Sequence, residues 1–268
     1  HLVLRRQRQM CIRDSSSIDK KPAKKSPTPP FTTSTLQQEA SRKLGFGVTR
    51  TMSTAQKLYE AGLITYMRTD SVTISNEAKS SIVQKIESKY GEDYVNLRDY
   101  KNKNKSAQEA HEAVRPTDIN IEEITSDYDQ QRLYHLIWKR TISSQMSDAQ
   151  IERTVVNIKS DSYNEFFVAR GEVIKFDGFL RVYNEGTDDE IEEEKSVLPA
   201  LSISENLNLL SISSRESFSR PPSRFTEASL VKKLEELGIG RPATYATTIS
   251  TIQNRGYIAK GVLSLIHI

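Results

Sequence analysis

The chain has 268 residues, of which 36% are hydrophobic and 27% are charged, and its formal net charge at pH 7 is +3. This length allows more than one hydrophobic core, and no apolar run approaches the roughly 20 residues that a membrane-spanning helix needs, so we expect no membrane partner. Cys11 is the single cysteine, which excludes an intrachain disulfide and a zinc site built from several cysteines.

The two ends of the chain predict no folded element. Residues 1–15 show neither a helical nor a strand period, and residues 16–30 are dense in Ser, Lys and Pro, which is typical of an exposed linker. Residues 263–268 do not continue the pattern before them. We therefore expect a non-native or disordered leader and linker over 1–30, and a non-native tail over 263–268.

Helical patterns fill residues 31–150. The first helix is expected to begin near Ser34, to carry apolar residues at four-residue spacing and to end at Gly45. Similar patterns predict three further helices, at about 53–59, 75–90 and 129–146. We expect a helical domain over 31–150.

After residue 150 the hydrophobic period changes from that of a helix to two. The segments TVVNI, EFFVA, EVIKF, FLRVY and LSISENLNLLSI have this period, which predicts a β-rich domain over 151–218. Helical patterns return over 219–262, where Thr226 begins a helix that ends at Gly238 and Pro242 opens a second one before GYIAKGV. Helix, turn, helix and strand is the order of a winged-helix element.

The segment GLITYMRTDS, residues 62–71, is the best candidate for chemistry. If it is extended, Ile64, Tyr66 and Arg68 lie on one side, so that the phenol and the guanidinium are neighbours. A guanidinium favours a phenolate and neutralises an attacked phosphate, which suits phosphoryl transfer. An arginine two residues from a tyrosine is also common in structural roles, so spacing alone leaves both interpretations open.

Other side chains are suited to phosphate contacts. His111 can donate a hydrogen bond or a proton beside a phosphodiester, although a purely structural histidine is the commoner case. Hydroxyls and arginines position phosphates, and the start of the helix after Pro242 offers free N–H groups. The candidate DNA-binding residues are Arg115, Arg224, Arg241, Thr244 and Thr248.

Three long blocks of the sequence resemble the successive signature blocks of bacterial type IA DNA topoisomerases. They are PPFTTSTLQQEASRKLGFGVTRTMSTAQKLYEAGLITYMRTDS, QEAHEAVRPTD and RPPSRFTEASLVKKLEELGIGRPATYATTISTIQNRGYI. The resemblance implies that Tyr66 forms a 5′-phosphotyrosyl link to one DNA strand, that Arg68 stabilises the attacked phosphate and that His111 assists beside it. It also implies an α+β multidomain fold, in which a helical tyrosine-bearing domain, a β-rich arch and a second winged-helix-like segment form part of a toroid.

The family's Toprim domain, whose carboxylates hold Mg²⁺, and its zinc ribbons have no counterpart in these residues. We therefore expect no metal ligands in this chain, weak binding of single-stranded DNA and negligible cleavage unless the missing domain is supplied. The sequence also has no G-x-x-x-x-G-K-[ST] phosphate loop, consistent with a reaction that does not use ATP. The resemblance implies a monomer in the cytoplasm, at the nucleoid, acting on single-stranded or negatively supercoiled DNA.

Two other functions use similar residues. The chain could be a non-enzymatic winged-helix module that binds DNA, with Tyr66 in a structural role, but the TYMR block argues against this. A tyrosine recombinase also uses Tyr and Arg. That family has an H-x-x-R box and a late tyrosine, whereas here His111 and Arg115 are four residues apart and Tyr66 precedes both.

Overall fold

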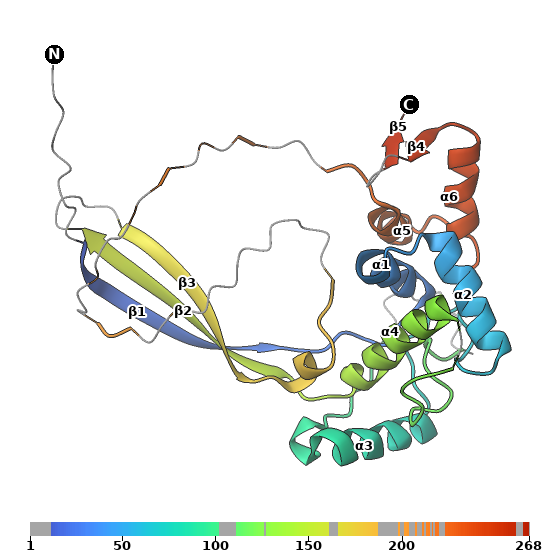
Figure 1. Ribbon diagram of the computed structural model, residues 1–268, viewed down its shortest axis with the longest axis horizontal. Coiled ribbons are helices and arrows are strands. Elements are labelled where there is room, and N and C mark those ends of the chain that lie inside the picture. The colour runs from blue at the N-terminus through green and yellow to red at the C-terminus, as the bar shows by residue number, and fades with distance from the viewer. Residues whose placement is uncertain are drawn as a thin grey trace. The chain divides into compact units, whose positions relative to one another are not determined.

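The computed structural model shows a mixed helix and sheet protein with two compact units (Figure 1). The structure describes residues 12–101, 111–125, 127–160, 166–186, 223–260 and 265–267, and also 198, 201–203, 207, 211, 213–214, 216 and 218–219. One unit comprises residues 1–25, 149–177 and 191–220, and the other comprises 26–148, 178–190 and 221–268. Across the described residues, no helix has the length and apolar character needed to cross a membrane.

The first unit is built on a three-stranded antiparallel sheet of order β1-β2-β3. Its strands are β1 (Ile12–Lys25), β2 (Ala149–Ser160) and β3 (Phe166–Phe176). The predicted strands at 154–158 and 172–176 are confirmed as parts of β2 and β3, and so is the described part, 166–169, of the strand predicted at 165–169. Most of the strand predicted over 201–212 lies outside the described residues.

Over residues 12–25 the structure departs from the expected disordered linker. These residues form β1, in which Pro22 lies opposite Glu152 of β2. An edge strand tolerates proline because the missing N–H can face away from the sheet, and edge strands are commonly rich in lysine. A Lys- and Pro-rich strand therefore resembles a linker when its distant partner is unknown. Residues 265–267, within the segment expected to be a non-native tail, pair as β5 (Leu265–His267) with β4 (Ile258–Lys260).

The second unit holds six α-helices among its described residues. They are α1 (Thr33–Leu44), α2 (Val48–Glu60), α3 (Asn76–Tyr90), α4 (Tyr128–Ser144), α5 (Glu227–Glu236) and α6 (Tyr245–Asn254). Short 3₁₀ helices follow α3 at Glu92–Tyr94 and follow β3 at Gly178–Arg181. The FLRVY segment is therefore not a strand. The last helix begins at Tyr245 instead of Pro242, because residues 242–244 form a turn.

The C-terminal helices pack on the N-terminal ones, α5 against α1 and α6 against α2 (Figure 1). Val48, Val231, Tyr245 and Ile249 form the apolar core of this contact. Polar contacts reinforce it, because a carboxylate oxygen of Glu227 accepts the Val48 N–H at 2.8 Å, at the start of α2. The segment after residue 221 therefore shares one unit with the segment that carries Tyr66.

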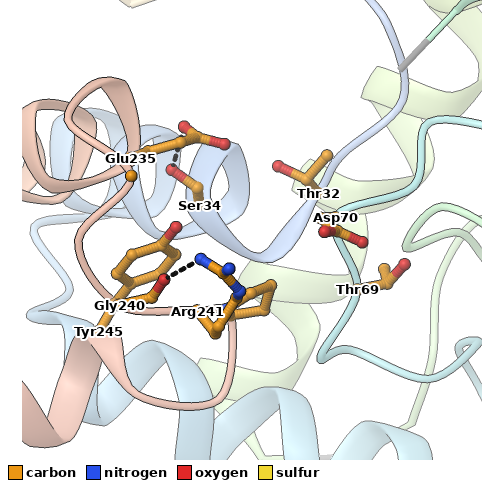
Figure 2. A pocket seen from close by; sticks show the side chains of 10 residues that line it. Thr32, Ser34, Thr69, Asp70, Glu235, Gly240, Arg241 and Tyr245 are labelled. Atoms are coloured by element: carbon orange, nitrogen blue, oxygen red, sulfur yellow. Dashed lines mark hydrogen bonds between the residues drawn. The ribbon is translucent and has the colours of Figure 1, made fainter. Parts of the chain in front are cut away.

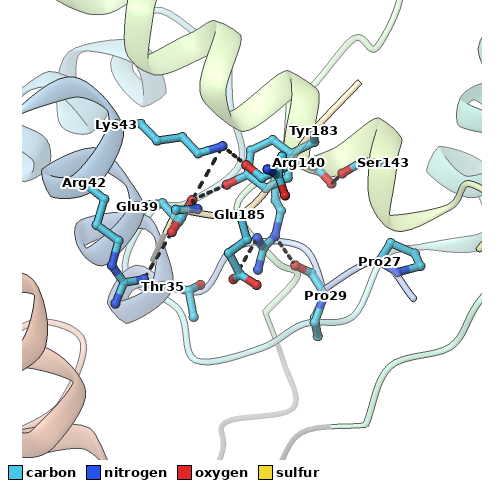
Figure 3. A network of polar contacts seen from close by, with 12 residues as sticks. Pro27, Pro29, Thr35, Glu39, Arg42, Lys43, Arg140, Ser143, Tyr183 and Glu185 are labelled. Atoms are coloured by element: carbon cyan, nitrogen blue, oxygen red, sulfur yellow. Dashed lines mark hydrogen bonds and ion pairs between the residues drawn. The ribbon is translucent and has the colours of Figure 1, made fainter. Parts of the chain in front are cut away.

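A buried polar network joins α1, α4 and the chain after β3 (Figure 3). Glu39 of α1 is 1% exposed and accepts hydrogen bonds from the Tyr183 hydroxyl at 2.6 Å and the Gly186 N–H at 3.1 Å. Arg140 of α4 is 2% exposed and donates to Pro29 O at 2.7 Å. Its guanidinium also donates to Glu185 at 3.2 Å. Both buried charges therefore have partners, as buried ions require.

Gly178 lies against the chain that follows α4, where a side chain has no room. Its φ is +49°, and a Cβ there would lie 2.5 Å from Ser147 O and 2.6 Å from Asp148 O. We predict that Gly178→Ala lowers the free energy of unfolding by about 2–4 kcal/mol in urea denaturation, from backbone strain and overlap together. Gly45→Ala is the control, since its φ is +68° but its surroundings are open. It should cost about 1 kcal/mol. Equal losses for the two variants would contradict the steric argument.

Candidate active site

Tyr66 lies in an irregular segment after α2. Only Ile64 forms a β-bridge there, with Pro116, and residues 65–70 are not a strand. Ile64 and Met67 are 1% and 0% exposed, whereas Tyr66 is half-buried and Arg68 is exposed. The expected alternation of Ile64, Tyr66 and Arg68 on one side is therefore wrong, because the segment turns instead of extending.

The residue before Tyr66, Thr65, binds the chain around residue 113 through its side-chain hydroxyl. Thr65 Oγ1 donates to Ala113 O at 2.7 Å and accepts the Arg115 N–H at 2.9 Å. The Thr65 N–H donates to Arg115 O at 2.9 Å, and the Thr117 N–H donates to Leu63 O at 3.1 Å. These bonds hold residues 63–65 against 113–117.

On the other side of Tyr66, Thr33 at the start of α1 makes a second attachment. Its hydroxyl donates to Met67 O at 2.7 Å and accepts the Thr69 N–H at 2.8 Å. The Thr33 N–H donates to Thr69 O at 2.9 Å. Thr33 is 0% exposed. Tyr66 thus lies between two anchored points of the backbone.

The structure brings together two of the three predicted catalytic residues. The ring centroids of Tyr66 and His111 are 5.7 Å apart, with an interplanar angle of 36°. Tyr59 of α2 packs edge-on against the Tyr66 ring at 5.4 Å. A phenol beside an imidazole can exchange a proton with it directly or through one water molecule.

Arg115 is held within the chain. Its guanidinium donates to Glu112 through Nε at 3.0 Å and to Pro116 O at 2.9 Å. Glu112 also accepts the Ser75 N–H, at the start of α3, at 2.7 Å. Burial alone would raise the pKa of Glu112, but the hydrogen bonds from Ser75 and the charge of Arg115 outweigh it and lower the pKa below 4.5. In this conformation Arg115 therefore supports the fold around His111.

The lowered pKa of Glu112 predicts a pH dependence of stability. A carboxylate whose folded pKa is depressed stabilises the fold above its unfolded pKa, and loses that contribution as the pH falls through the folded value. We expect Glu112→Gln to unfold at lower urea concentration than the wild type at pH 7. The difference between the two midpoints should shrink as the pH falls below about 4.5. A constant difference from pH 7 to pH 3 would show that the ionised carboxylate contributes nothing.

A small pocket connects the segment after Tyr66 to the turn between α5 and α6 (Figure 2). Arg241 and Tyr245 line it together with Thr69 and Asp70, which follow Tyr66 closely in the chain. Burial, then the charges of Glu235 and Asp70, raise the pKa of Tyr245. The candidate residue Arg241 therefore lies near the Tyr66 segment, which sequence spacing did not show.

The remaining candidate residues have more peripheral positions. Thr244 binds the backbone of Arg241, accepting its N–H at 2.9 Å and donating to its O at 3.1 Å. Thr248 is half-buried on α6, and Arg224 is exposed ahead of α5. The structure does not place Arg224 or Thr248 against Tyr66.

The described residues offer no fitting set of metal ligands. No three His, Cys, Asp or Glu side chains in the described part of the chain gather in a way that could hold a metal ion. The Mg²⁺ that the resemblance implies thus has no fitting site among the described residues.

Sequence reasoning missed the threonines on either side of Tyr66. Thr33 and Thr65 form their bonds with residues distant in sequence, and threonine is too common for its presence to be a signal. Asp70 was also missed, although it stands four residues after Tyr66 in the same block.

Comparison with known proteins agrees with the resemblance. The family model described as DNA topoisomerase matches residues 7–266. The chain is 50% identical to DNA topoisomerase 1 of Rickettsia felis over 258 residues, covering 90% of this chain and 33% of the relative. It is 51% identical to the Rickettsia bellii protein over 259 residues, covering 90% and 32%.

The fold comparison gives the same result. The full-length topoisomerase I structure from Thermotoga maritima matches with a TM-score of 0.82 and 36% identity, over 96% of this chain and 43% of that one. The chain spans about a third of the length of the curated relatives it matches. With the family model matching nearly every residue, the chain belongs to the DNA topoisomerase family.

Proposed function

We propose that this chain carries the nucleophile of a type IA DNA topoisomerase reaction. Tyr66 attacks a backbone phosphate of one DNA strand, forms a 5′-phosphotyrosyl link and releases a 3′-hydroxyl. Strand passage and reversal of the attack then relax negatively supercoiled DNA without ATP, because the ester keeps the energy of the broken bond. The observation that carries this proposal is the Tyr66–His111 pair, with ring centroids 5.7 Å apart on two mutually hydrogen-bonded segments.

The neighbouring residues have distinct roles in the proposal. His111 takes the phenol proton or hydrogen-bonds the phosphate, and the exposed guanidinium of Arg68 neutralises the charge that develops on the phosphate oxygens. Mg²⁺ is supplied by a Toprim domain, as the family resemblance implies. Without that domain we expect these residues to bind single-stranded DNA weakly and to cleave it negligibly.

DNA binding extends to the C-terminal helices. We assign α5, α6 and β4 to a winged-helix-like element, and the sheet of β1, β2 and β3 to the arch of a toroid. In this proposal the residues that contact phosphates are Arg224, Arg241, Thr244 and Thr248. Arg241 is the best supported, because it lines a pocket with Asp70, which stands four residues after Tyr66. Arg115 joins them only if DNA displaces it from Glu112. The protein acts as a monomer at the bacterial nucleoid.

An end-labelled oligonucleotide tests the chemistry. The chain, supplied with a Toprim domain and Mg²⁺, is mixed with single-stranded DNA and stopped with denaturant. A 5′-phosphotyrosyl link retains a label placed at the 3′ end of the DNA and releases a label placed at the 5′ end. The reverse pattern would contradict the proposed polarity. DNA binding with no adduct would favour the alternative of a non-enzymatic DNA-binding module.

A further inference from the structure

We infer that Thr65 is a positioning residue, whose side-chain hydroxyl sets the placement of the Tyr66 ring against His111. The inference rests on the proposed role of Tyr66 and extends it to a residue that does not itself touch the reacting atoms. The proposed role belongs to the hydroxyl group of Thr65, so a serine at this position should fulfil it and a valine should not.

The position of the hydroxyl carries the argument. Thr65 directly precedes Tyr66, and its hydroxyl donates to the carbonyl of Ala113 at 2.7 Å, two residues from His111. The same oxygen accepts the Arg115 N–H at 2.9 Å. One side-chain oxygen thus joins the two segments that carry the rings, using its donor and one of its acceptor sites.

Backbone hydrogen bonds do not replace this contact. The bonds from Thr65 N to Arg115 O and from Thr117 N to Leu63 O involve residues that are farther from His111 in the chain than Ala113 is. The Ala113 N–H donates at 2.9 Å to Thr73 O, seven residues after Tyr66. Past Thr65 the chain leaves its partner, and its next attachment is the Thr33 hydroxyl at Met67 O. The peptide of Tyr66 therefore lies between two threonine hydroxyls, of which only the Thr65 hydroxyl binds the His111 segment.

A small displacement of the ring should matter for the chemistry. Misplacement of a reacting group by about 1 Å can cost roughly 100-fold in rate. Thr65→Val keeps the shape of the side chain but removes the donor and the acceptor, whereas Thr65→Ser keeps both. Comparison of the two variants isolates the hydroxyl.

The first experiment measures the ring pair without any DNA. In proton NMR of the chain, the Tyr66 ring current shifts the His111 ring protons, and Tyr66→Leu gives the size of that shift. The Thr65→Val variant should lose most of this ring-current shift at His111, and the Thr65→Ser variant should keep it. Thr141→Val is the matched control, since it removes a buried hydroxyl that donates to Ile137 O at 2.9 Å. An unchanged His111 shift in Thr65→Val would overturn the inference.

The second experiment measures adduct formation, with the chain supplied with a Toprim domain and Mg²⁺. Thr65→Val should slow the adduct by about 10- to 100-fold, with oligonucleotide affinity within about threefold, and Thr65→Ser should recover the rate. An adduct formed equally fast by Thr65→Val would overturn the inference and leave the proposed function standing. A wild-type protein that forms no adduct would overturn both.

Discussion

Replacement of Tyr66 by phenylalanine should abolish the covalent adduct, lowering its rate of formation by on the order of 10⁴-fold or more. In the proposed reaction the phenol oxygen is the attacking atom, and phenylalanine has no oxygen in its place. Arg68 and His111 would remain, so DNA should still bind with its affinity changed by less than about threefold. Adduct formation with a labelled oligonucleotide, with the chain supplied with a Toprim domain and Mg²⁺, measures the first effect, and fluorescence anisotropy measures the second.

A matched tyrosine provides the control for this variant. Tyr128 at the start of α4 is 70% exposed, so Tyr128→Phe removes an accessible phenol from outside the site. It should form the adduct at the wild-type rate. An adduct that persists in Tyr66→Phe, or disappears in Tyr128→Phe, would contradict the assignment of the nucleophile.

Replacement of Glu39 by alanine should lower the free energy of unfolding by about 3–5 kcal/mol. The change removes the acceptor of the Tyr183 hydroxyl and the Gly186 N–H, both of which bind one carboxylate oxygen. It also removes the partner of Arg42 at 3.1 Å and of Lys43 at 3.9 Å. Donors buried without an acceptor cost most of this energy. Urea denaturation followed by circular dichroism measures the loss.

Two further variants separate the network from a general effect of losing a glutamate. Glu39→Gln keeps an acceptor oxygen and should lose less than the alanine variant. Glu87→Ala, on the exposed side of α3, should change stability by less than about 0.5 kcal/mol. Comparable losses for Glu39→Ala and Glu87→Ala would show that the buried network in Figure 3 contributes little.

The helices could be predicted because their signals are local. Ser75 caps α3 and Gly91 follows its end, in agreement with the helix predicted at about 75–90, and Thr226 caps α5 as predicted. The start of α2 was placed too late, because its cap is Gly47, which makes no side-chain cap bond. Its first N–H is bound instead by Glu227, far along the chain, and no local pattern contains that contact.

The rest of the fold and the site depends on contacts between distant residues. β1 is a strand because β2 pairs with it, and its own lysines and proline suggest a linker. Tyr66 and His111 were both chosen from the sequence, but their proximity could not be predicted, because the hydrogen bonds of Thr65 with Ala113 and Arg115 join segments that are distant in the chain. The assumption of an extended strand failed at Tyr66, where residues 65–70 form no strand and the side chains of Thr65 and Thr33 bind the neighbouring segments.

Identification of the residue that carries the nucleotide is the most direct test of the proposed nucleophile. Trypsin cuts after Lys57 and Arg68, and the peptide between these sites contains both Tyr59 and Tyr66. Tandem mass spectrometry of the trapped adduct, after nuclease digestion of the DNA, can distinguish the two tyrosines. We predict a nucleotide joined through its 5′-phosphate to Tyr66. A nucleotide on Tyr59, or on any other residue, would contradict the proposed reaction.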